Sequence, residues 1–139
     1  MRPSSRPIRA YARLIRGEAA LAQSNARAAL DHAREAQKLA DTWPGHVILA
    51  RAYLALDAFT EATSELDAAI ARSGEAVAVT LDDVPTYRYF PQVIYYKGLA
   101  QAGLKSAAAK ESFAAFLAIK KIGDEASGLV ADARKRLTQ

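Results

Sequence analysis

The sequence predicts an all-α protein built from repeated helical hairpins, and three observations lead to this prediction. Apolar residues recur at helical spacing through most of the 139-residue chain. Alanine, the best helix former, supplies an unusual share of a hydrophobic fraction of 51%. The 7 glycines and 5 prolines cluster at the ends of apolar segments, where they would separate helices. A chain of this length buries about two-thirds of its unfolded surface, so we expect one domain without covalent staples.

The first helical pair is expected over residues 8–40, after a flexible leader at 1–7. Proline is disfavoured inside a helix, so the leader is expected to extend through Pro7. Apolar residues then recur at helical spacing up to the turn at Ser24 and Asn25, which are turn-forming and capping residues. A second helix rich in alanine follows this turn.

The clearest pair is expected over residues 43–73. Pro44 suits the first turn of a helix, where its missing N–H costs nothing. Asp57 lies in the turn between the two helices, and Gly74 is a natural stop after the second. Leu66 is expected to fill the core between them.

The repeating pattern breaks at residues 75–90, which we expect to form an irregular connector. Unstructured loops longer than about 12–15 residues are uncommon in compact domains, so its aromatic residues are expected to lie against the fold or contact a ligand. Pro91 is expected to open the next helix, and a third pair is predicted over residues 91–120. A last helix is expected at 126–137.

Matching positions, most of them occupied by small residues, recur between the pairs at a constant sequence offset. Four residues of the first pair match four residues of the second pair, and the residue numbers in each match differ by 33. The first set is Gly17, Ala20, Ala29 and Ala36, and the second, in the same order, is Ala50, Tyr53, Ala62 and Ala69. A third copy contains Gly98, Ala109 and Phe113, with one residue fewer between its helices. The offset from Ala50 to Gly98 is 48, so the connector adds about one helix's length of chain.

These spacings resemble the tetratricopeptide (TPR) repeat, whose period is about 34 residues. The resemblance covers nearly the whole chain. It implies a TPR-like α-solenoid of three helix-turn-helix pairs plus a C-terminal capping helix at 126–137.

A narrower resemblance concerns the second half of the chain. The segment LDDVPTYRYFPQVIYYKGLAQAGL, followed by FAAFLAIKK and LVADARKRL, is similar to the closing repeats of bacterial multidomain signalling proteins. In those proteins, TPR arrays follow a serine/threonine kinase domain or another signalling domain. The resemblance implies an interaction region of such a protein or a stand-alone relative, and the chain itself carries no kinase motif.

The TPR resemblance implies a protein–protein interaction module. In that family the first helix of each pair lines a concave groove, which suits an extended peptide or a helix. An alternative is that some of the groove positions pack on the connector or on the capping helix. The positions that match the groove here are Leu14, Glu18, Val47, Arg51, Leu54, Tyr95 and Leu99.

Chaperone-binding members of the family clamp a peptide carboxylate with Lys, Asn and Arg in the groove. Those places are occupied here by other residues, so binding of a chaperone tail is not expected. The residues in question are Leu14, Glu18, Ile48, Gln92 and Tyr96.

The net charge of +4 is distributed in blocks, which suggests two alternative functions. Residues 1–40 carry +5, residues 41–90 carry −5 and residues 91–139 carry +4. A basic N-terminal strip would suit nucleic acid, although the acidic middle argues against it. Self-association between the basic ends of one copy and the acidic centre of another is the other alternative. The strip consists of Arg2, Arg6, Arg9, Arg13 and Arg16.

The sequence offers little for catalysis or cofactor binding, and we expect neither an enzyme, a metal site nor a cofactor. There are no cysteines, and the two histidines, His32 and His46, lack a carboxylate at helical metal-site spacing. Asp82 and Asp83 are adjacent and would point to opposite sides of an extended chain. No apolar run reaches about 18 residues, so no membrane helix is expected. The cytoplasm is the expected compartment.

Overall fold

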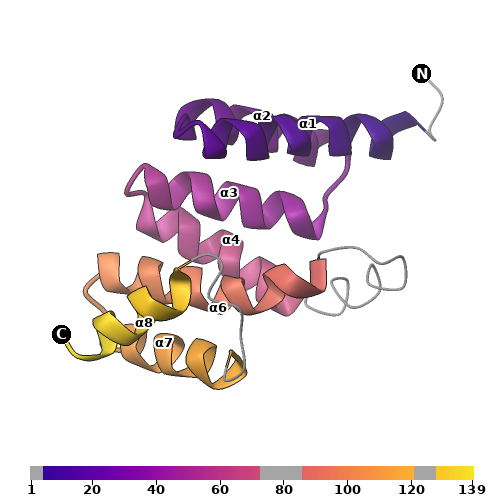
Figure 1. The fold of residues 1–139 in the computed structure, drawn as a ribbon. Helices are drawn as coiled ribbons and strands as arrows, with labels where there is room; N and C mark the ends of the chain where they lie inside the picture. Colours follow the sequence, from indigo (N-terminus) through magenta and orange to yellow (C-terminus); the bar gives the residue numbers. More distant parts are fainter. Residues whose placement is uncertain (1–4, 73–85, 121–127) are drawn as a thin grey trace.

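The computed structural model describes residues 5–72, 86–120 and 128–139. These residues form seven helices and no strand (Figure 1). The helices are α1 (Ser5–Ala22), α2 (Ala26–Leu39), α3 (Trp43–Ala55), α4 (Phe59–Ala71), α6 (Thr86–Gly103), α7 (Ala108–Ile119) and α8 (Leu129–Leu137).

The helices stack as successive hairpins along one direction (Figure 1). Helix α1 pairs with α2, α3 with α4, and α6 with α7. Contacts between pairs run from α2 to α3 and from α4 to α6, and α8 packs on α7. The first helices α1, α3 and α6 also contact one another in that order. One end of the stack is therefore formed by α1 and α2, and the other by α7 and α8.

Helices α2 and α3 begin at side-chain caps, and the helix bounds depart slightly from those expected from the sequence. Helix α1 begins at Ser5 rather than Ile8, because Pro7 falls in the first turn, where no backbone N–H is required. Asn25 caps α2 by accepting a hydrogen bond from the N–H of Ala28 at 3.1 Å. Thr42 caps α3 in the same way, through Gly45.

The start of α6 corrects two expectations. The helix begins at Thr86, so residues 86–90 are helical rather than part of a connector, and Pro91 lies inside the helix. The preference of proline for a first turn is a tendency only, and here the helix passes through it with one intrahelical hydrogen bond fewer. The rest of the expected connector, residues 75–85, lies outside the described residues. So do residues 126–127 of the expected capping helix, which the structure describes from Leu129.

Each hairpin turn contains one residue with a left-handed backbone. The φ angles are 59° at Ser24, 57° at Asp57 and 56° at Lys105, and these residues are separated by the repeat offsets of 33 and 48. In each case the next N–H reaches back five residues, as from Asn25 to the carbonyl of Ala20 at 2.8 Å. This is the Schellman arrangement, which normally places glycine at the left-handed position. Lys105 is still 48 residues after its counterpart Asp57. The one-residue deletion of the third copy therefore lies after the turn that contains Lys105.

Three apolar clusters form the core, and the repeated small residues lie within them. The first joins α1, α2 and α3, the second joins α3, α4 and α6, and the third joins α6, α7 and α8. Ala29, Ala36, Ala62 and Ala69 are fully buried, as the sequence predicts. Small residues matter because the helices approach closely.

Glycines lie at two of these approaches. A Cβ on Gly17 would lie 3.2 Å from Cγ2 of Ile48, which packs there from the next repeat. A Cβ on Gly98 would lie 2.7 Å from the Phe113 ring. The contacts between helices therefore depend on the absence of a side chain at these positions.

Candidate interaction surface

The seven predicted groove residues separate into a buried group and a group that reaches the surface. Leu14, Val47 and Tyr95 occupy equivalent positions in the three repeats, and each belongs to a different core cluster. All three are buried, so the structure places them beneath the surface of α1, α3 and α6 rather than on it. They support this surface from beneath.

The next equivalent row does reach solvent. Glu18, Arg51 and Leu99 are related by the same offsets of 33 and 48 in residue number. Glu18 on α1 is exposed, and Arg51 and Leu99 are partly buried. Arg51 donates two hydrogen bonds to the Glu18 carboxylate, at 2.7 and 2.9 Å. The first helices of neighbouring repeats are thus joined by side chains as well as by packing.

Aromatic and aliphatic residues extend this row. The Arg51 guanidinium carbon lies 5.8 Å from the centroid of the Tyr96 ring, within cation–π range. Leu54, one turn after Arg51, is partly buried against the second cluster. From the sequence, Tyr96 was named only as a residue at a place of the chaperone clamp and not among the expected contact residues of the groove. The surface therefore combines a charged pair, an aromatic ring and aliphatic side chains.

Tyr95 is held by the last helix, as the alternative interpretation allows. Its hydroxyl donates to Oδ2 of Asp132 on α8 at 2.5 Å, and Arg136 donates to the same oxygen at 2.6 Å. Burial raises the pKa of Tyr95, and the hydrogen bond to Asp132 adds to this effect. Burial alone would raise the pKa of Asp132, but the hydrogen bonds from Tyr95 and Arg136 outweigh it and lower that pKa. Helix α8 therefore caps the third repeat through a polar contact as well as through the core.

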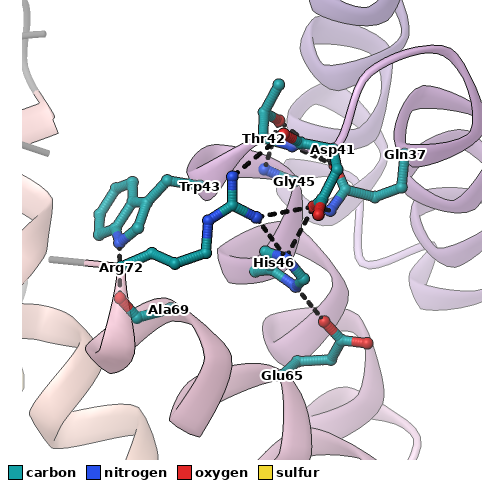
Figure 2. A network of polar contacts seen from close by, with 9 residues as sticks. All are labelled: Gln37, Asp41, Thr42, Trp43, Gly45, His46, Glu65, Ala69 and Arg72. Carbon is teal, nitrogen blue, oxygen red and sulfur yellow. Dashed lines mark hydrogen bonds and ion pairs between the residues drawn. The ribbon is translucent and has the colours of Figure 1, made fainter. Parts of the chain in front are cut away.

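A second polar cluster joins α2, α3 and α4 where the first repeat meets the second (Figure 2). His46 lies between two carboxylates: its Nε2 is 2.8 Å from Asp41, and its Nδ1 is 2.5 Å from Glu65. Arg72, at the end of α4, donates to the Asp41 carboxylate at 2.8 Å. Trp43 donates its indole N–H to the carbonyl of Ala69 at 2.9 Å. The α2–α3 turn is thereby fastened to the C-terminal end of α4.

The charges in this cluster shift one another's protonation. The hydrogen bond with Glu65 raises the pKa of His46, and the charges of Glu65 and Asp41 raise it further against the effect of burial. Burial alone would raise the pKa of Asp41, but its contacts with Arg72 and His46 outweigh this and lower it. The protonated imidazole can donate to both carboxylates at once, so His46 has a structural role at the repeat junction.

Gly45 leaves room for the side chain of Gln37 at this junction. A Cβ at Gly45 would lie 2.0 Å from the side-chain oxygen of Gln37. That oxygen accepts a hydrogen bond from the N–H of Thr42 at 3.0 Å. Gln37 also donates to Asp41 at 3.0 Å, so it ties α2 to the turn that follows it.

The basic strip lies along α1, at one end of the stack. Arg6, Arg9 and Arg16 are exposed and Arg13 is partly buried, while Arg2 lies outside the described residues. A shallow groove of about 320 Å³ runs between α1 and α2 beside this strip. Its lining residues are Arg9, Ala12, Arg13, Arg16, Glu35, Lys38 and Leu39.

The described residues contain no cluster of three or more His, Cys, Asp or Glu side chains placed to hold a metal ion. Over the same residues, no helix is both long and apolar enough to cross a membrane. Asp82 and Asp83 lie outside the described residues.

Comparison with known proteins supports the fold. No protein-family model matches the chain, and no curated protein sequence matches it. Among solved structures, the chain is similar to a TPR-like protein from Chlorobium tepidum TLS, known from a crystal structure at 2.54 Å resolution. The sequences are 21% identical, the TM-score is 0.83, and the match covers 100% of this chain and 98% of the other. The predicted all-α, TPR-like stack is thereby confirmed.

Proposed function

We propose that this chain is a protein-interaction module that binds a peptide or a protein segment across α1, α3 and α6. The observation that carries this proposal is the alignment of equivalent positions on the three first helices. Because α1, α3 and α6 contact one another in order, Glu18, Arg51 and Leu99 form a row that runs across the repeats. Scaffolds of this TPR-like kind generally serve protein–protein interaction.

The chemistry of the row favours a segment with both polar and apolar side chains. The Glu18–Arg51 pair presents opposite charges side by side, which a partner can meet with opposite charges of its own. Tyr96 and the partly buried Leu54 and Leu99 offer apolar surface next to this pair. Such alternation suits an extended peptide or one face of a helix.

The proposal includes the absence of catalysis and an origin in a bacterial signalling protein. The ionisable groups gathered at the repeat junction contact one another and join the two repeats. They are Asp41, His46, Glu65 and Arg72. The similarity to the closing repeats of kinase-linked proteins supports a role as an interaction region or as a stand-alone cytoplasmic relative.

Peptide display provides a direct test. Peptides enriched on the wild-type protein would be synthesised, and their dissociation constants measured by fluorescence anisotropy on the wild type and on Arg51→Glu. We expect Arg51→Glu to weaken binding by about tenfold or more, as expected for reversal of a charge at a contact site. Ser64→Glu, on an exposed position of α4, introduces the same side chain away from the row and should leave binding unchanged.

Circular dichroism of both variants would verify that the fold is intact. Equal binding by wild type and Arg51→Glu would refute the proposed surface. Peptides that bind only through the arginines of α1 would instead assign the activity to the end of the stack.

A further inference from the structure

The outer side of α1 carries an apolar stripe that no described helix covers. Ile8, Tyr11 and Ile15 are spaced to lie on one face, and they are 72%, 47% and 70% exposed. Ala12 and Ala19, on the same side of the helix, are exposed as well. Exposed apolar stripes of this kind mark sites of association.

The repeat shows what covers the equivalent stripe elsewhere in the same chain. Ile15 matches Ile48 on α3 at the repeat offset of 33, and Ile48 is only 3% exposed. Ile48 packs against Gly17 of α1 and belongs to the cluster formed with α2. Ala12 and Ala19 match Gly45 and Ala52, which are buried at the same junction. The stripe on α1 is thus equivalent to the face of α3 that α2 covers, and no described helix covers it.

The charge around the stripe indicates what kind of helix fits. Where α3 has the buried Leu49, α1 has Arg16 at the matching position. Arg9, Arg13 and Lys38 join Arg16 along the adjacent groove between α1 and α2, with Glu35 as the acidic residue. Lys38 pairs with Glu35 at 2.7 Å, which leaves the groove with an excess of positive charge. A helix that covers the stripe must therefore present acidic residues toward α2.

We propose that the α1 end of the stack docks an acidic amphipathic helix from another protein, in the way that α2 covers α3. The apolar side of that helix would cover Ile15 and Ile8, and its carboxylates would face Arg9, Arg13 and Arg16. A second copy of this chain fits less well, because a symmetric end-to-end pair would bring two arginine-rich faces together. Phosphate contacts would use the arginines alone and would not account for the isoleucines. This surface is separate from the row on α1, α3 and α6 and does not rest on the function proposed above.

The test uses the whole protein and two labelled 14-residue helical peptides of the length of α2. Both carry alanine and leucine at the positions of Ala29, Leu30 and Ala33; one has glutamate at the flanking positions, and the other has lysine. We expect the glutamate peptide to bind, with an affinity that falls as salt is raised, and the lysine peptide not to bind. Burial of an isoleucine contributes enough that Ile15→Glu should weaken binding by about tenfold or more.

Matched variants separate this site from the rest of the molecule. Ile119→Glu removes an exposed isoleucine at the other end of the stack and should bind as the wild type does. Arg16→Glu should weaken binding, whereas Lys105→Glu, also exposed, and Arg51→Glu on the α3 row should not. These two controls keep a failure of this proposal distinct from a failure of the proposed function.

Three results would overturn the inference. The first is equal binding by the wild type and Ile15→Glu, or equal binding of the two peptides. The second is binding of an oligothymidylate that depends on Arg16 but not on Ile15, which would make the strip a phosphate-binding site. The third is concentration-dependent dimerisation in light scattering that Ile15→Glu abolishes, which would make a second copy the occupant.

Discussion

Arg51 of α3 forms a two-bond ion pair with Glu18 of α1, and the two residues stand at the same position of consecutive repeats. Glu18 is 49% exposed and Arg51 is 27% exposed, so solvent weakens the attraction between them. Surface pairs of this kind contribute about 0–1 kcal/mol. We therefore expect Glu18→Arg to lower the free energy of unfolding by about 1 kcal/mol or less, because it puts two arginines together. The double variant Glu18→Arg with Arg51→Glu should recover most of that loss in urea titrations, and failure to recover it would show that the pair adds nothing.

Leu66 tests the core of the second repeat. Its side chain is fully buried between α4, α3 and α6, so Leu66→Ala should lower the free energy of unfolding by about 2–5 kcal/mol. Leu104→Ala, at an exposed position, should cost about 0.5 kcal/mol or less. Chemical denaturation with matched m-values measures both. A loss well under about 1 kcal/mol for Leu66→Ala would contradict the packing described here.

Lys105, the left-handed residue of the third turn, predicts a substitution that raises the free energy of unfolding. A left-handed backbone costs an ordinary residue about 1–2 kcal/mol, and glycine avoids most of this while losing some entropy on folding. We expect Lys105→Gly to stabilise the protein by about 0.5–1 kcal/mol in thermal or urea unfolding. Lys110→Gly, within α7, should instead destabilise it by about 0.5–1 kcal/mol. Destabilisation by both variants would contradict the strained backbone at Lys105.

His46 predicts a pH dependence of stability. Because its pKa is raised in the folded state, its protonation contributes stability that is complete below the unfolded value of about 6.5. This contribution is lost as the pH rises through the higher folded pKa. The difference in free energy of unfolding between wild type and His46→Gln should therefore be larger at about pH 6 than at about pH 9.

One variant checks the cause of this dependence. Glu65→Gln removes the carboxylate that raises the pKa of His46, so it should reduce the pH dependence. An unchanged profile in Glu65→Gln would rule out the His46–Glu65 pair as its source.

The cap on the third repeat is tested by Tyr95→Phe, which deletes the hydroxyl that bonds Asp132. Hydrogen bonds to charged groups contribute about 1.5–3 kcal/mol, and we expect the lower end because Arg136 still bonds the same carboxylate. Tyr53→Phe removes a hydroxyl that accepts a hydrogen bond from Arg34 at a more exposed site. Its loss in free energy of unfolding should be smaller than that of Tyr95→Phe. If urea unfolding gave equal losses of unfolding free energy for the two variants, the hydrogen bond to Asp132 would contribute no more stability than the one to Arg34.

Local chemistry accounts for what the sequence predicts well. The repeat offset depends on small residues such as Ala29 and Ala62, and helices can approach closely only where such residues lie. Asn25 is recognisable as a cap because its side chain acts on a backbone N–H three residues away. The cap acts within one helical turn, and the small residues recur in each hairpin. Both patterns can therefore be recognised in a single amino-acid sequence.

Contacts between distant segments explain what the sequence does not predict. From the sequence, Tyr95 matches a groove position. In the structure its hydroxyl bonds Asp132 of α8, which lies 37 residues later in the chain. His46 has no carboxylate at helical spacing, yet the folding of α4 places Glu65 against its ring from 19 residues away. Pro91 suggested the start of a helix that in fact begins five residues earlier.

The ion pair between Arg72 and Asp41 has a consequence for how the array comes apart. It fastens the end of the second hairpin to the turn leaving the first. In a linear array, stability is a sum of hairpin terms and nearest-neighbour terms. The ion pair adds a small term to the packing of α2 on α3, which couples the two hairpins. Residues 5–72 should thus behave as one cooperative unit in native-state hydrogen exchange, with amides of α2 and α4 opening at the same free energy.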